Sequence, residues 1–219
     1  MHLLAVTPIH VDPAEIARRQ QRYDRLAPPG LTVRLEDVGS GSEVPRALET
    51  SEDVVASEAA VHSRFAGADL SGIDGFLPDC VLDPTVDHPD TLPLPVHGIG
   101  RLCAGFLAGL GGRMGAVARN RAIAEELDRK LSSYGLAPVV PTAVLDLSVD
   151  DISDDAVWAA AVRARVGGLP VNRVLNACSA VEVGVSGDGP LLVDPTRVAL
   201  RLLGLQRELT SVPAEVAAP

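Results

Sequence analysis

Cysteine, aromatic residues and basic charge are all scarce in this sequence, and each shortage argues against a class of function. The 219 residues include three cysteines, Cys80, Cys103 and Cys178, an odd and widely spaced set that fits neither a disulfide framework nor a CxxC metal site. Aromatic residues make up 3% of the chain, too few for a surface on which bases or sugars stack. Acidic residues outnumber basic ones by 29 to 19, and the net charge of −10 repels nucleic acid and anionic lipid.

Long apolar runs are missing as well. No stretch approaches the roughly 20 apolar residues that a membrane-spanning helix needs. Pro8 and Asp12 interrupt the apolar N-terminus, which has no basic flank, so we expect no signal peptide and a cytoplasmic location. The histidines lack HxxxH-type spacing, so we expect no metal site. The predicted partner is a small molecule, not a nucleic acid or a membrane.

Apolar residues, 47% of the chain, occur in short segments that alternate with helical patterns. This alternation is typical of βαβ units and parallel sheets. The segments predicted as strands are 2–6, 32–38, 73–79, 94–99, 113–118, 139–147, 171–177 and 190–194. Helices are predicted at 13–26, 49–65, 99–110, 120–135 and 153–168, and after the last strand. Thr50 and Asp53 predict a capping box, and Gly135 predicts a left-handed helix end.

The chain contains a short internal repeat. "LLAVTPIH" near the start resembles "MGAVARNR" further on, and "GFLPDC" resembles "RVLNAC". The repeat predicts two similar α/β lobes, each with a cysteine at the end of its third strand. We predict that lobe 1 comprises residues 1–97 plus 195–219 and that lobe 2 comprises 98–194.

Two of the cysteines are thereby predicted to face the cleft between the lobes. Ligands of parallel sheets bind beyond the carboxyl ends of the strands, where Cys80 and Cys178 would lie. A thiolate on one side of a carbon acid can remove its α-proton while a thiol on the other side delivers a proton, which inverts configuration without a cofactor. Because a free thiol titrates near about 8.5, its pKa must be lowered, and helix starts after each cysteine, in "VLDPT" and "SAVEV", are expected to do this.

Motifs in chain order carry a resemblance to a known family. "DGFLPDCVLDP" and "NRVLNACSA" are similar to the two cysteine motifs of the aspartate/glutamate/hydantoin racemase superfamily, above all of hydantoin and allantoin racemases. "GPLLVDPTRVALRLLG" resembles the closing strand and helix. The resemblance covers nearly the whole chain and implies two pseudosymmetric flavodoxin-like lobes with an interlobe cleft. It also implies an isomerase that needs no cofactor, with Cys80 and Cys178 as its acid/base pair, and a homo-oligomer.

The same resemblance implies which residues hold the substrate. They follow the first and fifth strands or come directly after a thiol, and they are Thr7, Pro8, Val81, Arg119, Asn120 and Ser179. Hydantoin racemases have Asn-Pro-Asn where this chain has "TPIH", threonines where it has "ARNR", and glycines in place of Ala177 and Ala180. The sequence therefore leaves open whether the substrate is a carboxylate, an amino acid or a hydantoin. An arginine in the cleft favours a carboxylate.

Several of these residues also fit plainer roles. A free cysteine is often a small core residue, and we assign Cys103 to packing in its helix. Arg119 also fits a solvated arginine at a helix start, and Thr7 fits a turn or a cap. Asp79 and Asp83 would raise the pKa of Cys80 if they pointed at it, so we expect them to face away and to brace the loop.

Two further segments invite a functional interpretation. "GIGRLC" imitates a dinucleotide-binding fingerprint, but it lacks the third glycine and an acidic residue after the next strand, so nicotinamide binding is not predicted. The proline-rich "LDPTVDHPDTLPLP" is either a connector or also a wall of the cleft.

Other functions remain open on the sequence alone. Relatives with one thiol decarboxylate arylmalonates, and others isomerise maleate through a covalent cysteine adduct. A specialised biosynthetic isomerase, and a catalytically silent α/β module that binds a ligand, also fit the pattern.

Overall fold

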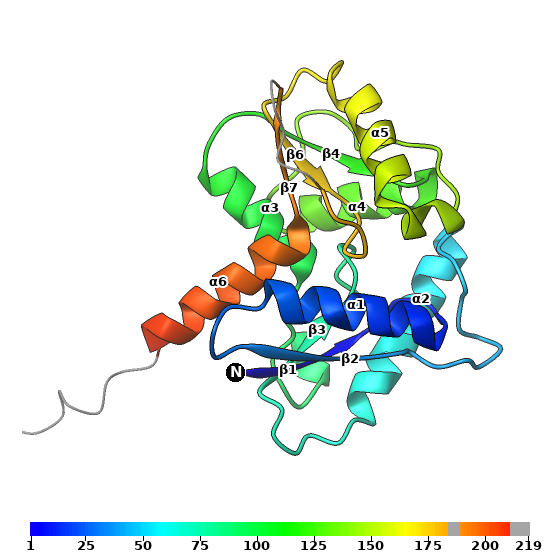
Figure 1. Ribbon diagram of the computed structural model, residues 1–219, viewed down its shortest axis with the longest axis vertical. Coiled ribbons are helices and arrows are strands. Elements are labelled where there is room, and N and C mark those ends of the chain that lie inside the picture. The colour runs from blue at the N-terminus through cyan, green and yellow to red at the C-terminus, as the bar shows by residue number, and fades with distance from the viewer. Residues whose placement is uncertain (184–188, 211–219) are drawn as a thin grey trace, which may run out of the picture.

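The computed structural model describes residues 1–183 and 189–210, which form two parallel β-sheets covered by helices (Figure 1). The first sheet has the order β2-β1-β3, from β1 (His2–Val6), β2 (Thr32–Glu36) and β3 (Gly75–Pro78). The second has the order β5-β4-β6-β7, from β4 (Met114–Ala118), β5 (Ala143–Val144), β6 (Arg173–Asn176) and β7 (Leu191–Val193). The predicted α/β class with parallel sheets is confirmed.

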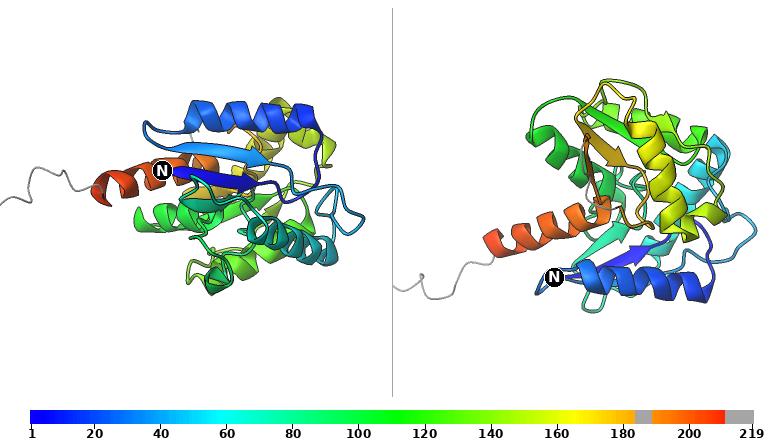
Figure 2. Two further views of the ribbon diagram at one scale, coloured as in Figure 1. Left: turned by 90° about the horizontal axis from the view of Figure 1, so that it is seen from below. Right: turned by 45° about the horizontal axis from the view of Figure 1, so that its top comes forward.

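Helices connect the strands where the sequence predicts them. They are α1 (Pro13–Leu26), α2 (Ser51–Ala66), α3 (Ile99–Gly109), α4 (Arg121–Ser133), α5 (Asp155–Val166) and α6 (Pro195–Thr210). Short 3₁₀ turns lie at Pro89–Thr91 and Asp150–Ser153. Two views of the fold show α1 lying along the first sheet and α6 running out from between the two sheets (Figure 2).

Local sequence signals set several helix ends. The hydroxyl of Thr50 accepts a hydrogen bond from the Asp53 backbone N–H, and the Asp53 carboxylate accepts one from Thr50, so the predicted capping box is confirmed. Gly135, just after α4, has φ +71°, a left-handed conformation that glycine adopts without strain.

The predicted strand at 94–99 is wrong in extent. Only a bridge between Val96 and Phe76 forms there. Pro93 and Pro95 both precede Val96, and because proline has no N–H to donate, a longer ladder cannot grow along this segment. The strand predicted at 139–147 shrinks to β5 in the same way, since it contains Pro141.

Strand register confirms the internal repeat. Val6 pairs with Pro78 in the first sheet, and Val117 pairs with Asn176 in the second. Pro78 lies two residues before Cys80, and Asn176 lies two residues before Cys178. In each sheet, the strand that comes first in the chain lies between the two strands that follow it in the chain. The point at which the strand order reverses therefore lies beside the loop that carries the cysteine.

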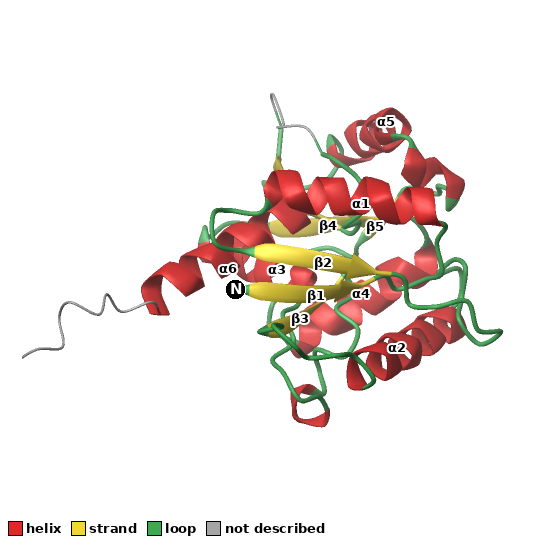
Figure 3. Ribbon diagram, turned by 60° about the horizontal axis from the view of Figure 1, so that its bottom comes forward, coloured by secondary structure: helices red, strands yellow, loops and turns green. Residues whose placement is uncertain are grey.

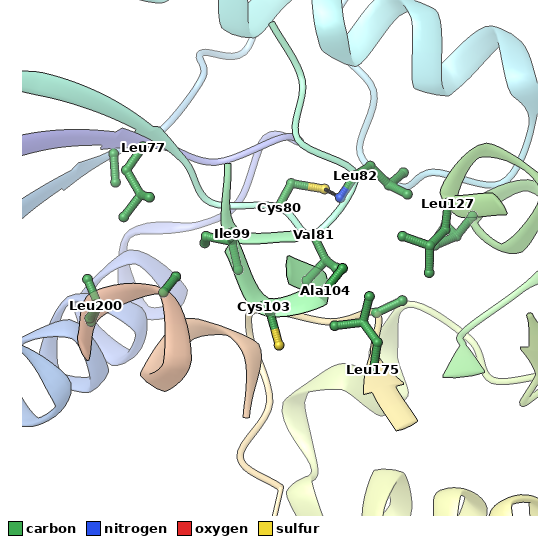
Figure 4. Packing of buried hydrophobic residues seen from close by; sticks show 14 of the residues in the cluster. Leu77, Cys80, Val81, Leu82, Ile99, Cys103, Ala104, Leu127, Leu175 and Leu200 are labelled. Carbon is green, nitrogen blue, oxygen red and sulfur yellow. Dashed lines mark hydrogen bonds between the residues drawn. The ribbon is translucent and has the colours of Figure 1, made fainter. Parts of the chain in front are cut away.

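The core is continuous between the two sheets. One cluster of buried apolar side chains includes Leu77 of β3 and Leu175 of β6 together with Leu107, Leu200 and Leu203 from α3 and α6. Figure 4 shows Leu77, Leu175 and Leu200 around α3. Figure 3 shows the strands of both sheets enclosed by helices. The boundaries predicted for the lobes stay a prediction, and residues 184–188 and 211–219 of those lobes lie outside the described part of the chain.

Among the helices of residues 1–183 and 189–210, none combines the length and the apolar character that crossing a bilayer requires.

The capping box of α2 supplies a first prediction. Thr50→Ala removes the hydroxyl that accepts from the Asp53 N–H, so the free energy of unfolding should fall by about 1 kcal/mol. Urea unfolding followed by circular dichroism measures this change. Ser51→Ala, one residue further on, removes a hydroxyl that contacts only its neighbour Glu52 and should change stability by less than about 0.5 kcal/mol. Equal effects of the two variants would contradict the assigned cap.

Candidate active site

Both cysteines predicted to react line one cavity of about 60 Å³. The cavity lies beyond the carboxyl ends of β3 and β6, as the rule for parallel sheets requires. Its lining comprises Pro8, Ile9, Arg19, Leu48, Asp79, Cys80, Val81, Leu82, Arg119, Ile123, Val149, Ile152, Ala177, Cys178, Ser179 and Ala180. Most of these side chains are apolar, so the two thiols share an enclosed site of low polarity.

Each thiol sits in a tight turn rather than at the start of a helix. The Leu82 backbone N–H donates to Cys80 Sγ at 3.4 Å (Figure 4), and the Ala180 N–H makes the equivalent contact with Cys178. The expectation that a helix begins after each cysteine is therefore wrong, because turns and bends follow both of them. Repetition of the same i+2 contact shows that the pseudosymmetry extends to the sulfur atoms.

Helix α1 holds the residue that precedes Cys80. The Arg19 guanidinium donates to Asp79 Oδ2 at 3.0 Å, and the Tyr23 hydroxyl donates to Asp79 Oδ1 at 2.7 Å. All three side chains are buried. Asp79 thus braces the loop against α1, as predicted, although its carboxylate still raises the pKa of Cys80.

The same helix also holds the loop after Cys178. Arg18 donates to the Ala180 carbonyl at 3.0 Å, and Arg22 donates to the Ser179 carbonyl at 3.2 Å. Arg22 also forms a buried ion pair with Asp194, in which its Nη2 atom donates to both carboxylate oxygens at 2.8 Å. One helix of the first lobe therefore fixes a cysteine loop of the second.

Helix α4 makes the reciprocal contact with the loop after Cys80. Lys130, 2% exposed, donates to Asp87 at 2.8 Å and lies 3.5 Å from the Asp83 carbonyl. The Asp83 carboxylate accepts hydrogen bonds from the backbone N–H groups of Gly100 and Arg101, so it caps α3 and braces the loop as predicted. Burial raises the pKa of Asp83 to about 7.

The glycines of "GIGRLC" serve this packing. A Cβ atom at Gly100 would lie 2.1 Å from the Val81 carbonyl oxygen, and one at Gly98 would lie 2.6 Å from the Asp83 carboxylate. The first turn of α3 therefore needs both glycines in order to approach the Cys80 loop. Cys103, further along α3, is fully buried and does not line the cavity, so its assignment to packing is confirmed.

A direct hydrogen bond joins the two cysteine loops. The Ser179 hydroxyl donates to the Asp79 carbonyl at 2.9 Å. Since Asp79 precedes Cys80 and Ser179 follows Cys178, this bond limits how far the two thiols can separate. Ser179 and Val81 both line the cavity, as the sequence predicted, and each directly follows a thiol.

Burial dominates the acidity of both thiols. The pKa of Cys80 is raised to about 12, chiefly by burial and also by the carboxylates of Asp83 and Asp79. Burial also raises the pKa of Cys178, but there the positive charges of Arg19 and Arg22 act in the opposite direction. The expectation of lowered thiol pKa values is wrong, and the two thiols have different electrostatic surroundings.

Arg119 lies in the cavity wall and is 3% exposed, so it is not a solvated arginine at a helix start. Its Nη1 atom pairs with Glu49 at 2.7 Å, and its Nη2 atom donates to the Leu48 carbonyl at 2.9 Å. Its Nε atom is buried and has no hydrogen-bond partner among the described residues. A buried donor left unpaired is costly, and a ligand oxygen would satisfy it.

Two residues predicted to contact the substrate, Thr7 and Asn120, lie outside the cavity lining. The Thr7 hydroxyl accepts from the Val38 N–H and donates to Asp37, outside the cavity lining. Pro8 and Ile9, which follow Thr7 in the loop after β1, do line the cavity. Asn120 caps α4 through the Ile123 N–H and donates to the loop at 48–49, which also leaves it outside the lining.

Sequence reasoning missed much of the cavity wall. Arg19 reaches the cavity from α1, Leu48 from the loop before α2, and Ile123 from α4. Val149 and Ile152 close another side from the loop after β5. Of the proline-rich segment 82–95 only Leu82 lines this cavity, so that segment is not its lid. No local motif marks these residues, because tertiary contacts bring them together.

No known protein-family model matches this sequence, and no curated protein sequence matches it either. Solved structures do match it. An allantoin racemase from Pseudomonas fluorescens aligns with a TM-score of 0.79 and 17% identity, over 100% of this chain and 97% of that one. An allantoin racemase from Klebsiella pneumoniae aligns with a TM-score of 0.72 and 17% identity, over 100% and 94%.

A Picrophilus torridus aspartate racemase aligns with a TM-score of 0.61 and 12% identity, over 93% of both chains. The resemblance predicted from the sequence motifs is thereby confirmed at the level of the fold. The chain therefore shares the two-lobed α/β fold of these racemases.

Burial of the thiols predicts their chemical reactivity. With a pKa of about 12, the thiolate fraction of Cys80 falls about tenfold for each pH unit below that value. Iodoacetamide should therefore barely modify Cys80 at neutral pH and should modify it faster as the pH rises. Cys178 is partly exposed and should react first, whereas Cys103 should stay unmodified until the protein unfolds. Peptide mapping by mass spectrometry separates the three sites, and rapid modification of Cys80 at pH 7 would contradict the prediction.

Proposed function

We propose that this protein is a cofactor-independent racemase or epimerase that uses Cys80 and Cys178 as an acid/base pair. The observation that carries the proposal is the placement of both thiols in the wall of one cavity, at the ends of equivalent strands. Structural likeness to allantoin and aspartate racemases supports the same reaction class. A small molecule with an acidic C–H bond would bind between the two sulfur atoms.

The two thiols take different roles in this proposal. Asp79 raises the pKa of both thiols, but Arg19 and Arg22 favour the thiolate at Cys178, whereas Asp83 favours the protonated thiol at Cys80. Cys178 therefore removes the α-proton, and Cys80 delivers a proton to the opposite face. In the reverse direction the roles exchange, as microscopic reversibility requires.

Negative charge moves onto the substrate oxygens when the α-proton leaves. Val81 and Ser179 each follow a thiol in the cavity lining, and their backbone N–H groups are the donors proposed to stabilise that charge. Arg119 is proposed to bind the substrate carboxylate through Nε, the atom that has no protein partner among the described residues.

The remaining wall indicates the kind of substrate. Leu48, Ile123, Val149 and Ile152 are apolar, and the cavity of about 60 Å³ is small. We therefore propose a small carboxylate or amino-acid-like compound with a short apolar substituent at its stereocentre. A neutral ring of the hydantoin type would offer the Nε donor of Arg119 no charged acceptor.

The two-thiol reaction can be tested by exchange of the α-proton in D₂O. Incubation with candidate amino acids, 2-substituted carboxylates and hydantoins should give deuterium incorporation and loss of optical purity. Cys80→Ala and Cys178→Ala should each lower the racemisation rate at least about 100-fold, because each removes one positioned acid or base. Cys103→Ala, which alters a thiol outside the cavity, should keep the activity. Unchanged racemisation in both single variants would exclude the proposed pair.

The same panel separates the alternatives. Release of carbon dioxide from an arylmalonate would indicate a decarboxylase, and a stable mass adduct on one thiol would indicate a covalent cis–trans isomerase. Binding of a compound with no exchange, no release and no adduct would indicate a silent binding module.

The role of Arg119 yields a separate prediction. Arg119→Lys keeps the charge but loses the guanidinium Nε donor, so KM for a carboxylate substrate should rise about tenfold while binding of an uncharged analogue changes little. Steady-state kinetics measures both quantities. Arg121→Lys is the matched control, because Arg121 is exposed and pairs only with Glu125 on the outer face of α4. An equal rise of KM in both variants would remove Arg119 from the substrate site.

A further inference from the structure

A second, smaller cavity lies behind Cys80. Its volume is about 10 Å³, roughly the room that a single water needs. The residues that line it are Leu48, Val54, Ser57, Glu58, Cys80, Leu82, Pro84, Glu126 and Lys130. Cys80, Leu48 and Leu82 also line the larger cavity, so Cys80 stands in the wall between the two spaces.

The small cavity borders an open groove on its other side. Val54, Glu58 and Glu126 line both the small cavity and a groove of about 680 Å³ between α2 and α4. The side chain of Glu58 is 28% exposed, so its carboxylate meets solvent. From the groove to Cys80 the route therefore passes an ionisable side chain and a space for one water.

Two glutamates lie on this route, and their hydrogen bonds differ. Both carboxylate oxygens of Glu126 are held by Arg129, at 2.8 and 2.7 Å. In Glu58 the hydrogen bonds converge on Oε1, which accepts from the Thr85 N–H at 3.0 Å and lies 3.4 Å from Lys130 Nζ. Lys130 is itself held closer to Asp87, at 2.8 Å. Glu58 is therefore the carboxylate with an oxygen left to exchange a proton.

We propose that Glu58 relays protons between solvent and Cys80 through one water in the small cavity. When Cys80 is a thiolate, the water gives it a proton, protonated Glu58 gives the water a proton, and solvent in the groove reprotonates Glu58. The reverse sequence removes a proton from the Cys80 thiol. The relay rests on the proposed function and adds a positioning residue that acts through Cys80 without touching the substrate.

Racemisation by two thiols creates the need for such a relay. After Cys178 removes a proton and Cys80 delivers one, Cys80 is left as the thiolate and Cys178 as the thiol. The next turnover in the same direction requires that both sulfur atoms return to their starting protonation states. Cys178 is partly exposed and can lose its proton to solvent, whereas Cys80 is buried, so a route on its other side allows its reset without passing through the substrate cavity.

Steady-state kinetics distinguishes a relay from a structural role. Glu58→Gln keeps the size and the hydrogen-bond acceptor of the side chain but cannot pass on a net proton. Because the reset follows product release, kcat should fall about tenfold while kcat/KM stays within about twofold of the wild-type value. A role limited to bracing Lys130 would lower kcat/KM in proportion to kcat, and that result would overturn the relay.

Exchange of the Cys80 proton tests the relay without any substrate. After the protein is mixed into D₂O, decay of the Cys80 S–H infrared band reports how fast the thiol exchanges with solvent, and Cys80→Ala identifies the band. Glu58→Gln should slow the decay about tenfold. Equal rates in the wild type and this variant would overturn the relay. Slower exchange in a protein that racemises nothing would instead show that the proposed function, and not the proton route, is wrong.

Three further variants complete the test. Glu52→Gln, at a residue that lines the groove but not the small cavity, should leave exchange unchanged. Glu58→Asp retains a carboxylate and should exchange faster than Glu58→Gln, which also covers the case in which glutamine prevents folding. Slower exchange in Glu126→Gln with normal exchange in Glu58→Gln would assign the route to Glu126 and overturn the proposal.

Discussion

One face of α1 positions both cysteine loops, and the geometry of the cavity depends on it. Arg19 and Tyr23 bind Asp79 before Cys80, while neighbours on the same face, Arg18 and Arg22, bind the carbonyls after Cys178. A helix is stiff, so the two loops are held at a fixed spacing by a single element. The buried ion pairs involved add little net stability because their desolvation is costly, but they specify position and are strongly destabilising to break singly.

The two halves of the molecule keep the same backbone pattern but not the same side chains. Equivalent strand ends carry Pro8 in one sheet and Arg119 in the other, and both line the cavity. Arg19 and Arg22 act to lower the pKa of Cys178, Asp83 raises that of Cys80, and Asp79 raises both. The duplicated framework therefore fixes where the two sulfur atoms lie, while the side chains around them make the two positions chemically different.

The sequence predicted most of the sheets and helices, and the placement of both thiols, because strand patterns and strand ends are local signals. It could not separate Pro8 from Thr7, because both lie in the loop after β1, where no strand alternation applies. The contribution of Leu48 to the cavity, and the reach of Arg22 from α1 to the opposite lobe, have no local signature. The acidity of Cys80 was misjudged for the same reason, because its burial is produced by segments far apart in the chain.

Unequal surroundings of the two thiols have a thermodynamic consequence for a racemase. Two mirror-image compounds have equal free energies in water, so the ratio of kcat to KM must be the same for both directions of the reaction. The unequal charges around the two thiols can then make kcat and KM differ between the two directions only by the same factor. Such an enzyme would favour one enantiomer at saturation and neither of them when substrate is dilute.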